Sequence, residues 1–495
     1  MDTQSSVSAW SRRRFLGQLG GLTAASLLAA CGQQQSAAPA KPAAEPAKPA
    51  EPAKPAEAAK PAAPAAAAPA APPASAPAAA AKPAEPADKP VVAGVFNVWF
   101  SANWNEVTDK AVGETFVDWG KEKGIKVEWQ SIPGSPQQLA KESAAVAAGQ
   151  PPELNRSNLT YWYSQGETTN LKPLVDKFKD KAGGMYPIAI SSLTSDDGAV
   201  IAAPYAIDVW PVHYRIDEIG AVTGGKFFDT WDQMIEMGPK IQKPPRSYLY
   251  CFALGHEGDH VNNMVTTLWG YGGRLANEKG VPDIQNPANK AGIEAIIKIW
   301  QAKLIPPDTF AQTVTSWNNE TYQKGRALMA INPATIMGWL LVNDKELADK
   351  TGLSAAPKGP AGTFAEAGAL GFQYFKKAKM ADKAESALEY FLEPARLEKI
   401  SKSVEGRFVP VYRDQTKGDF WEKSKFAEMK NIAEVGRIRE WPAAPQPWIP
   451  DVTDAKYTLS DMMNKIINEN MKIEDAQAWA QKEMMDSYNK FAKKA

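Results

Sequence analysis

The fold is decided by the stretch Gly94-Val95-Phe96-Asn97-Val98-Trp99-Phe100. This stretch alternates and is rich in β-branched and aromatic residues, which is typical of a strand. Residues 105–123 then carry apolar side chains at roughly helical spacing, with Gly124 beyond them, so a helix is predicted. Residues 125–129 alternate again and predict a second strand. Strands that alternate with helices indicate a parallel α/β sheet whose sites form on loops at the carboxyl ends of the strands.

The pattern changes further along the chain. Strands and helices alternate to about residue 353, and the last third is mostly helical. A folded region of roughly 400 residues is long enough for two domains. Helices are expected at residues 381–391, 394–404, 423–435, 458–468 and 473–492.

Charge and cysteine content exclude several classes of protein. Lys and Arg total 56, and Asp and Glu also total 56, so nothing points to nucleic acid or to a strongly charged partner. After residue 31 the chain has one cysteine, Cys251, in an apolar run at 248–254 that predicts a buried strand. One thiol cannot form an internal disulfide, so the stability of the folded region depends on its core.

The first 31 residues have the features of an export signal. Arg12, Arg13 and Arg14 precede an apolar stretch at 15–30 that is shorter than the roughly 20 residues needed to span a bilayer. The paired arginines favour the twin-arginine route, and the basic flank of an ordinary signal is the alternative. Residues 28–31, Leu-Ala-Ala-Cys, resemble the lipobox of bacterial lipoproteins. This resemblance implies acylation at Cys31 and a lipid anchor in the cell membrane, at the extracellular face or in the periplasm.

Residues 32–93 are expected to be a disordered linker. They are nearly all Ala and Pro, with alternating Lys and Glu and almost no larger apolar side chains. Such a segment cannot bury enough surface to offset the entropy of ordering. A fully extended chain, at about 3.1 Å per residue, would hold the folded region more than roughly 100 Å from its anchor. Reach through a wall or surface layer is one interpretation, and a tolerated low-complexity tail is the other.

Short motifs in a fixed order then give a family resemblance. Residues 98–104 form a strand that ends in an aromatic and polar loop, and Ala147-Ala148-Gly149-Gln150-Pro151-Pro152-Glu153 follows. Further motifs are at 170–174 (Asn-Leu-Lys-Pro-Leu), 203–206 (Ala-Pro-Tyr-Ala), 230–234 (Thr-Trp-Asp-Gln-Met), 324–332 (Lys-Gly-Arg-Ala-Leu-Met-Ala-Ile-Asn) and 356–360 (Ala-Pro-Lys-Gly-Pro). From about residue 95 to 491 the chain resembles extracellular solute-binding proteins of the family that includes maltose-binding protein. The family has a glycine and often an aromatic residue where Asn332-Pro333 stands, which weakens the case for a sugar-stacking surface there.

This resemblance implies an α/β fold of the periplasmic-binding-protein type II class, with two hinge-connected lobes and a ligand cleft between them. Lobe one is expected at 94–206 and 367–435, and lobe two at 207–366 and, with the C-terminal helices, at 436–495. The implied function is capture of a small polar solute, with carbohydrate favoured, followed by lobe closure and delivery to the permease of an ABC importer. We expect a monomer that needs no cofactor or metal and does not act as an enzyme.

A sugar site needs flat aromatic faces and planar polar side chains on loops that follow strands. The loops after the first and third strands, the hinge, the loop after the Cys251 strand and later loops supply such residues. The candidates are Asn103, Trp104, Arg156, Asn158, Tyr161, Trp162, Asp208, Trp210, His256, Glu257, Asp259, Asn332, Arg407 and Trp448. The alternative for the tryptophans is core packing, and for Arg156 and Arg407 it is an ion pair at the surface or within a lobe.

Residues 256–260, His-Glu-Gly-Asp-His, match the H-E-x-x-H spacing of zinc peptidases. That chemistry needs both histidines on one helical face, and Gly258 disfavours a helix. A ligand-contacting loop is therefore the favoured interpretation, with a solvated polar loop or a non-catalytic metal site as alternatives.

Three other functions stay open at this point. A carbohydrate hydrolase would use the same aromatic residues but would need two carboxylates about 5–10 Å apart, and nothing selects Asp208 and Glu257 for that role. A surface adhesin would show no hinge closure. A polyamine or a glycerol phosphodiester could replace the sugar, although a polyamine calls for clustered carboxylates and an anion for more arginines.

Overall fold

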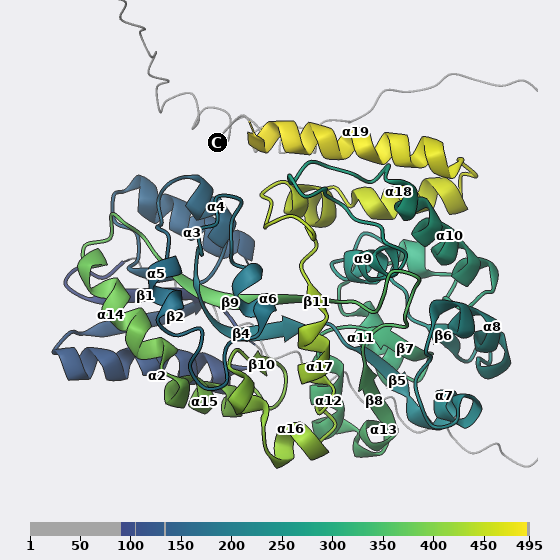
Figure 1. Cartoon of the computed structure of the whole chain (residues 1–495), viewed down its shortest axis with the longest axis horizontal. Helices are drawn as coiled ribbons and strands as arrows, with labels where there is room; N and C mark the ends of the chain where they lie inside the picture. The colour runs from purple at the N-terminus through teal and green to yellow at the C-terminus, as the bar shows by residue number, and fades with distance from the viewer. Residues whose placement is uncertain (1–90, 104, 133–134, 493–495) are drawn as a thin grey trace, which may run out of the picture. The chain divides into compact units, whose positions relative to one another are not determined.

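The computed structural model describes residues 91–103, 105–132 and 135–492 (Figure 1). The expected signal, Cys31, most of the expected linker and Trp104 lie outside the described residues. Among the helices of the described ranges, none is long and apolar enough to cross a membrane.

The N-terminal part of the fold is built on a mixed sheet, which we call the sheet of lobe one. Its strands are β1 (Phe96–Ser101), β2 (Val127–Ile132), β3 (Leu154–Asn155), β4 (Ala203–Val209), β9 (Ala365–Tyr374), β10 (Val409–Pro410) and β11 (Gly436–Arg437). They lie in the order β10-β4-β9-β3-β1-β2, and β11 pairs with β9. The β1–β2 and β1–β3 pairs are parallel, as the alternation of strands and helices predicts, whereas β9 runs antiparallel to β3 and β4.

Helix signals near the start of the chain are confirmed at the level of single atoms. The helix α2 (Glu106–Lys123) begins after Asn105, whose side chain accepts a hydrogen bond from the Thr108 N–H, and ends at Gly124 with a φ of 67°. These are the expected features of an N-cap and a left-handed C-cap. The other helices of lobe one are α3 (Ser135–Ala147), α4 (Leu159–Ser164), α5 (Lys172–Asp176), α6 (Pro187–Ser191), α14 (Ala381–Leu392), α15 (Pro394–Ser403), α16 (Asp419–Lys423) and α17 (Met429–Glu434).

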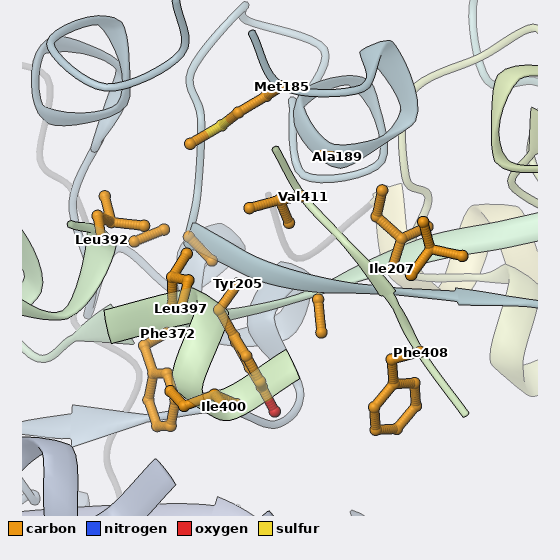
Figure 2. Packing of buried hydrophobic residues seen from close by; sticks show 14 of the residues in the cluster. Met185, Ala189, Tyr205, Ile207, Phe372, Leu392, Leu397, Ile400, Phe408 and Val411 are labelled. Carbon is orange, nitrogen blue, oxygen red and sulfur yellow. The ribbon is translucent and has the colours of Figure 1, made fainter. Parts of the chain in front are cut away.

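The core of lobe one forms where its central strands meet the helices α14 and α15. Tyr205 of β4 and Phe372 of β9 lie beside Leu397 and Ile400 of α15 (Figure 2). Ile207 of β4 belongs to the same core but lies on the side of Ala189 and Val411. Three residues of lobe two, Ala334, Met337 and Leu353, also belong to this core. The two lobes are therefore packed together at that point.

Lobe two has its own sheet and its own core. The strands are β5 (Val212–Arg215), β6 (Tyr248–Tyr250), β7 (Ala327–Ile331) and β8 (Thr351–Ser354), in the order β6-β7-β5-β8. Helices that surround it are α7 (Ile216–Thr223), α8 (Trp231–Ile241), α9 (His260–Gly270), α10 (Pro287–Gln301), α11 (Trp317–Gln323), α12 (Thr335–Asn343), α13 (Lys345–Asp349), α18 (Thr458–Ile467) and α19 (Ile473–Ala492). The two-lobe α/β fold expected from the sequence is confirmed.

Three segments connect the two sheets, and they meet at β9. The first passes from β4 to β5 through Trp210 and Pro211, the second returns from β8 to β9, and the third leaves lobe one after β11. The Trp210 N–H donates to the Glu366 carbonyl at 2.9 Å, which joins the first segment to the second. The sheet of lobe one therefore includes residues 207–209 and 365–366, which the sequence analysis assigned to lobe two.

Candidate functional site

At the carboxyl ends of β1 and β3, hydrogen bonds join two predicted side chains, Asn103 and Arg156, to Tyr205 of β4. The Tyr205 hydroxyl donates to the Asn103 side-chain oxygen at 2.8 Å and accepts from Arg156 at 3.0 Å. Asn103 in turn donates to Asp109 at 2.8 Å. We call Asn103, Arg156 and Tyr205 the lobe-one group. Burial raises the pKa of the Tyr205 hydroxyl to about 12, so it stays protonated and able to donate.

The carboxyl end of β4 carries an ion pair. Both carboxylate oxygens of Asp208 accept hydrogen bonds from the Arg407 guanidinium, one of them at 2.8 Å. The side chains are 15% and 11% exposed, so the pair is largely withdrawn from water. Both predicted candidates thus come together, as a bidentate pair of the geometry that arginine favours.

A second arginine, Arg439, holds several elements together just beyond β11. It donates to Glu366 at the start of β9 at 2.8 Å, to Asp454 at 3.0 Å and to Asn262 of α9 at 2.9 Å. Its neighbours thus belong to a connecting strand and to lobe two. We call Asp208, Asp259, Glu366, Arg407 and Arg439 the junction cluster.

Asp259 brings the loop after β6 into this cluster. Desolvation raises the pKa of its carboxyl to about 6, while an Asn318 hydrogen bond and the charges of Arg439 and Arg407 act in the opposite direction. The Asn318 amide donates to Asp259 at 3.0 Å. Arg439 donates to Asn262, three residues beyond Asp259, so this loop of lobe two lies near Arg439.

Two buried donors near the cluster have no partner among the described residues. These are the indole nitrogen of Trp210 and the side-chain nitrogen of Asn262. A buried polar group without a partner costs about 1–3 kcal/mol, so both are suited to the hydroxyls or carbonyls of a ligand.

A flat surface stands at the start of α18. The rings of His256 and Tyr457 stack with centroids 4.9 Å apart and planes inclined by 6°. His256 also contacts the Asp461 carboxylate at 2.6 Å. Tyr457 has a φ of 53°, in the left-handed region that non-glycine residues rarely adopt. Residues in this conformation are frequent at functional sites.

The H-E-x-x-H segment does not have the geometry of a zinc peptidase. The helix α9 begins only at His260, so His256 and Glu257 precede it. His260 bonds through Nδ1 to the Glu257 carbonyl at 2.6 Å, whereas His256 turns to Asp461. Within the described ranges, no group of three or more His, Cys, Asp or Glu side chains could hold a metal ion.

Two predicted tryptophans are buried, Trp448 in the core of lobe two and Trp162 in a small apolar cluster with Phe375 and Ala378. Trp162 is 3% exposed, and its indole nitrogen donates to Glu142 at 2.6 Å. Trp448 is 1% exposed, and its indole nitrogen donates to the Gly280 carbonyl at 3.0 Å. This placement favours the core alternative for both residues.

The remaining candidates lie on loops or inside the protein. Asn158 caps α4 in a left-handed conformation, with a φ of 52°. The Asn332 amide is buried and donates to Asn319 of α11 and Thr335 of α12, so the loop after β7 is held by the helices on either side. Glu257 is 2% exposed.

Sequence reasoning missed the residues that complete the site: Tyr205, Asn262, Asn318, Glu366, Arg439 and Tyr457. Arg439 follows the last connecting strand, a position at which any polar residue is expected. Tyr457 has only one weak signal, an aromatic residue just before a helix. Their roles depend on how distant segments meet, which local patterns do not encode.

Comparison with known proteins identifies the family. Residues 101–396, more than half of the chain, match the family described as bacterial extracellular solute-binding protein. The chain belongs to this family. It is a solute-binding protein of the kind that serves ABC transporters.

Solved structures show the same fold at low sequence identity. A sugar transporter from Arthrobacter chlorophenolicus A6 with bound laminaribiose matches with a TM-score of 0.64 and 14% identity, over 79% of this chain and 99% of its own. Maltose-bound MalE3 of T. maritima matches at 0.61 and 19%, over 79% and 99% of the two chains. A solute-binding protein from Agrobacterium radiobacter K84 in complex with ribitol matches at 0.61 and 16%, over 80% and 99%.

Proposed function

We propose that this solute-binding protein captures a carbohydrate at the junction cluster and delivers it to an ABC importer. The observation that carries the proposal is the Asp208–Arg407 pair, which lies at the end of β4 where the chain passes between the lobes, and whose charges act on the Asp259 carboxyl of lobe two. Carboxylate and guanidinium groups can bind several hydroxyls at once, because together they offer acceptors and donors in fixed planes.

Tyr457 supplies the second requirement of a sugar site. Its half-buried ring can pack against the C–H face of a pyranose while its hydroxyl remains free to bond. The indole nitrogen of Trp210 and the amide of Asn262 add donors that have no partner in the described part of the protein. Closure of the lobes would then bring Asn103 and Arg156 toward the same ligand.

Binding without chemistry is the form of this function that the geometry favours. Asp208 is engaged by Arg407, and burial together with the charge of Asp259 raises the pKa of Glu257 to about 8. An inverting or retaining glycosidase needs one carboxylic acid and one carboxylate on opposite sides of the scissile bond. Glu257 is almost fully buried, so it is not placed to reach such a bond.

We further propose that a lipid on Cys31 anchors the protein and that residues 32–93 form the spacer. The lipobox-like sequence before Cys31 supports the anchor. Mass spectrometry of the protein from a bacterial host should detect acylated Cys31 at the new N-terminus, and Cys31→Ser should move the protein from the membrane to the soluble fraction. Membrane retention of that variant would refute the lipid anchor.

The ligand class is tested by thermal unfolding of the purified protein with sugars, oligosaccharides, polyols, polyamines and glycerol phosphodiesters. A ligand at about 100 times its dissociation constant adds about 2.7 kcal/mol to the free energy of unfolding and raises Tm. Stabilisation by one sugar class, with the sugar recovered intact, is the expected result. Stabilisation by a polyol alone would select the class bound by the Agrobacterium protein, and hydrolysis of the sugar would refute binding without chemistry.

A further inference from the structure

A concave site, separate from the junction cluster, lies between α6 of lobe one and the segment that follows β11. This pocket has a volume of about 540 Å³, and small-molecule sites span roughly 300–1,000 Å³. Its walls are largely apolar and include Ile188, Ile190, Ile438 and Trp441. None of its lining residues belongs to the junction cluster or the lobe-one group, so it is a different site.

One cation in this pocket has no anionic partner among the described residues. Arg437 lines the pocket and donates through Nη1 to the Gly436 carbonyl at 2.7 Å. Its Nε is buried and lacks a hydrogen-bond partner in the described part of the chain. No carboxylate of those residues lies within ion-pair distance of it, although Glu366 stands opposite Arg437 in the pairing of β11 with β9. The Glu366 carboxylate instead accepts from Arg439.

The other charged residue in the lining is already neutralised. Glu434 accepts hydrogen bonds from Nε and Nη2 of Arg413 at 3.0 and 3.1 Å. Arg437 is therefore the uncompensated charge of the pocket. The Arg437 side chain is half-buried, but its Nε is shielded from water and makes no hydrogen bond within the described residues. An unpaired donor beside a positive charge favours a ligand that carries an anionic acceptor.

Aromatic rings flank the guanidinium of Arg437. It lies 5.7 Å from the ring centroid of Phe364 and 5.5 Å from that of Trp441. The two rings are 5.5 Å apart and are inclined by 37°. These contacts hold the guanidinium in place and leave the apolar wall of α6 to receive an apolar body.

The pocket is also fixed at one side by a contact between lobes. Gln446 donates to Asp196 at 2.7 Å and to the Ala444 carbonyl at 3.2 Å. Ala444 and Thr194 line the pocket, so this bond ties its two walls together close to their edge. The site is thus formed by the folded protein and does not need a ligand to assemble it.

We propose that this pocket binds a small organic carboxylate with an aromatic or aliphatic body. The carboxylate would accept from the Nε edge of Arg437, and the body would lie against Ile188, Ile190 and Trp441. An aromatic or aliphatic carboxylate matches both features, whereas a neutral sugar leaves the cation unpaired and an inorganic anion leaves the apolar wall empty.

Calorimetric titration of the full-length protein tests this proposal with benzoate, phenylacetate and octanoate, each paired with its neutral amide. We expect at least one carboxylate to bind, and its amide to bind roughly tenfold more weakly or worse because the charge-assisted bond is lost. Equal binding of acid and amide would overturn the proposal. So would binding of sulfate or chloride alone, or no binding by any carboxylate of the panel.

Variants locate the binding. Arg437→Gln should weaken the carboxylate by roughly tenfold or more. Ser191 is exposed at the rim of the pocket, so Ser191→Trp should block carboxylate binding without changing the hydrophobic core. This second variant keeps the test decisive if Arg437→Gln fails to fold. Arg396→Gln is the control, because Arg396 also stacks on an aromatic ring, Tyr390, but lies away from the pocket. Unchanged binding in Arg437→Gln or in Ser191→Trp would refute the site.

Discussion

At the scale of single residues, ligand binding depends on which polar atoms the protein has already used. Asp208 gives both carboxylate oxygens to Arg407, and Arg439 has bonds to three partners. Trp210 and Asn262 each keep a buried donor unused among the described residues. The charged groups are therefore already held by protein partners, whereas two neutral donors lack one. This combination suits a ligand with many hydroxyls.

Asp208→Asn should weaken solute binding by about tenfold or more, which corresponds to about 1.4 kcal/mol. The change leaves Arg407 without its carboxylate and allows the guanidinium to turn away from the ligand. Asp217→Asn is the matched control, because Asp217 forms a similar pair with Arg215 on a more exposed part of lobe two. Calorimetric titration with the sugar from the thermal panel measures both, and equal affinities would refute the role of Asp208.

Tyr457→Ala should also lose roughly tenfold in affinity, whereas Tyr457→Phe should keep most of it, because the ring supplies the contact. Both variants place a non-glycine residue at this positive φ, so the comparison separates stacking from backbone strain. Similar losses in Ala and Phe would instead assign the role to the hydroxyl, and no loss in either would remove Tyr457 from the site.

At the scale of elements, local signals predicted structure well where a cap or a clear period was present. The helix α2 has its Asn105 cap and Gly124 stop, and α19 extends over the expected residues 473–492. The predicted helix at 423–435 is present only as α17, Met429–Glu434, because Ser424 adopts an extended conformation and separates α16 from α17. Residues 249–254 are buried as expected, but only Tyr248–Tyr250 forms a strand, and the Leu254 N–H donates to the Thr309 hydroxyl.

The close packing of β11 against β9 gives an element-scale prediction. A Cβ added at Gly436 would lie 2.6 Å from the Ala367 Cβ and 3.1 Å from the Ala433 carbonyl oxygen. Gly436→Ala should lower the free energy of unfolding by about 1–3 kcal/mol through overpacking. Gly368→Ala in β9 is the control, because nothing lies within 4 Å of its added Cβ. Denaturant unfolding compares them, and equal stability would contradict this packing.

The loop after β6 should make stability depend on pH. Burial, with the charge of Asp259, raises the pKa of Glu257 from 4.5 to about 8, so the folded state holds this proton more tightly than the unfolded state. The resulting stabilisation is complete below about pH 4.5 and is lost as the pH rises through about 8.

Glu257→Gln cannot titrate, so the stability of the wild type relative to this variant should fall across that window by up to about 1.4 kcal/mol per pH unit. Denaturant unfolding at several pH values between those limits measures the difference. Glu278→Gln, at an exposed position, is the control. Parallel pH profiles for wild type and Glu257→Gln would contradict the assignment.

At the scale of the whole molecule, the order of motifs predicted two lobes because strands alternate with helices in both parts of the chain. The junction cluster could be predicted only in part. Asp208, Asp259 and Arg407 lie on loops or strand ends that could be predicted from the sequence. Glu366 and Arg439 come near them only because three connecting segments meet at β9. That meeting is a property of the assembled fold, and so is the burial of Trp162 and Trp448.

Capture of a sugar between the lobes is tested most directly by the distance between them with and without ligand. Spin labels on cysteines introduced at the exposed positions Asp180 of lobe one and Lys279 of lobe two, with Cys31 replaced, report that distance by pulsed electron resonance; Cys251 is buried. We predict that the saturating sugar shifts the mean distance by several ångströms and narrows its distribution, and that Asp208→Asn requires more sugar for the same shift. An unchanged distribution at saturating sugar would contradict capture by lobe closure.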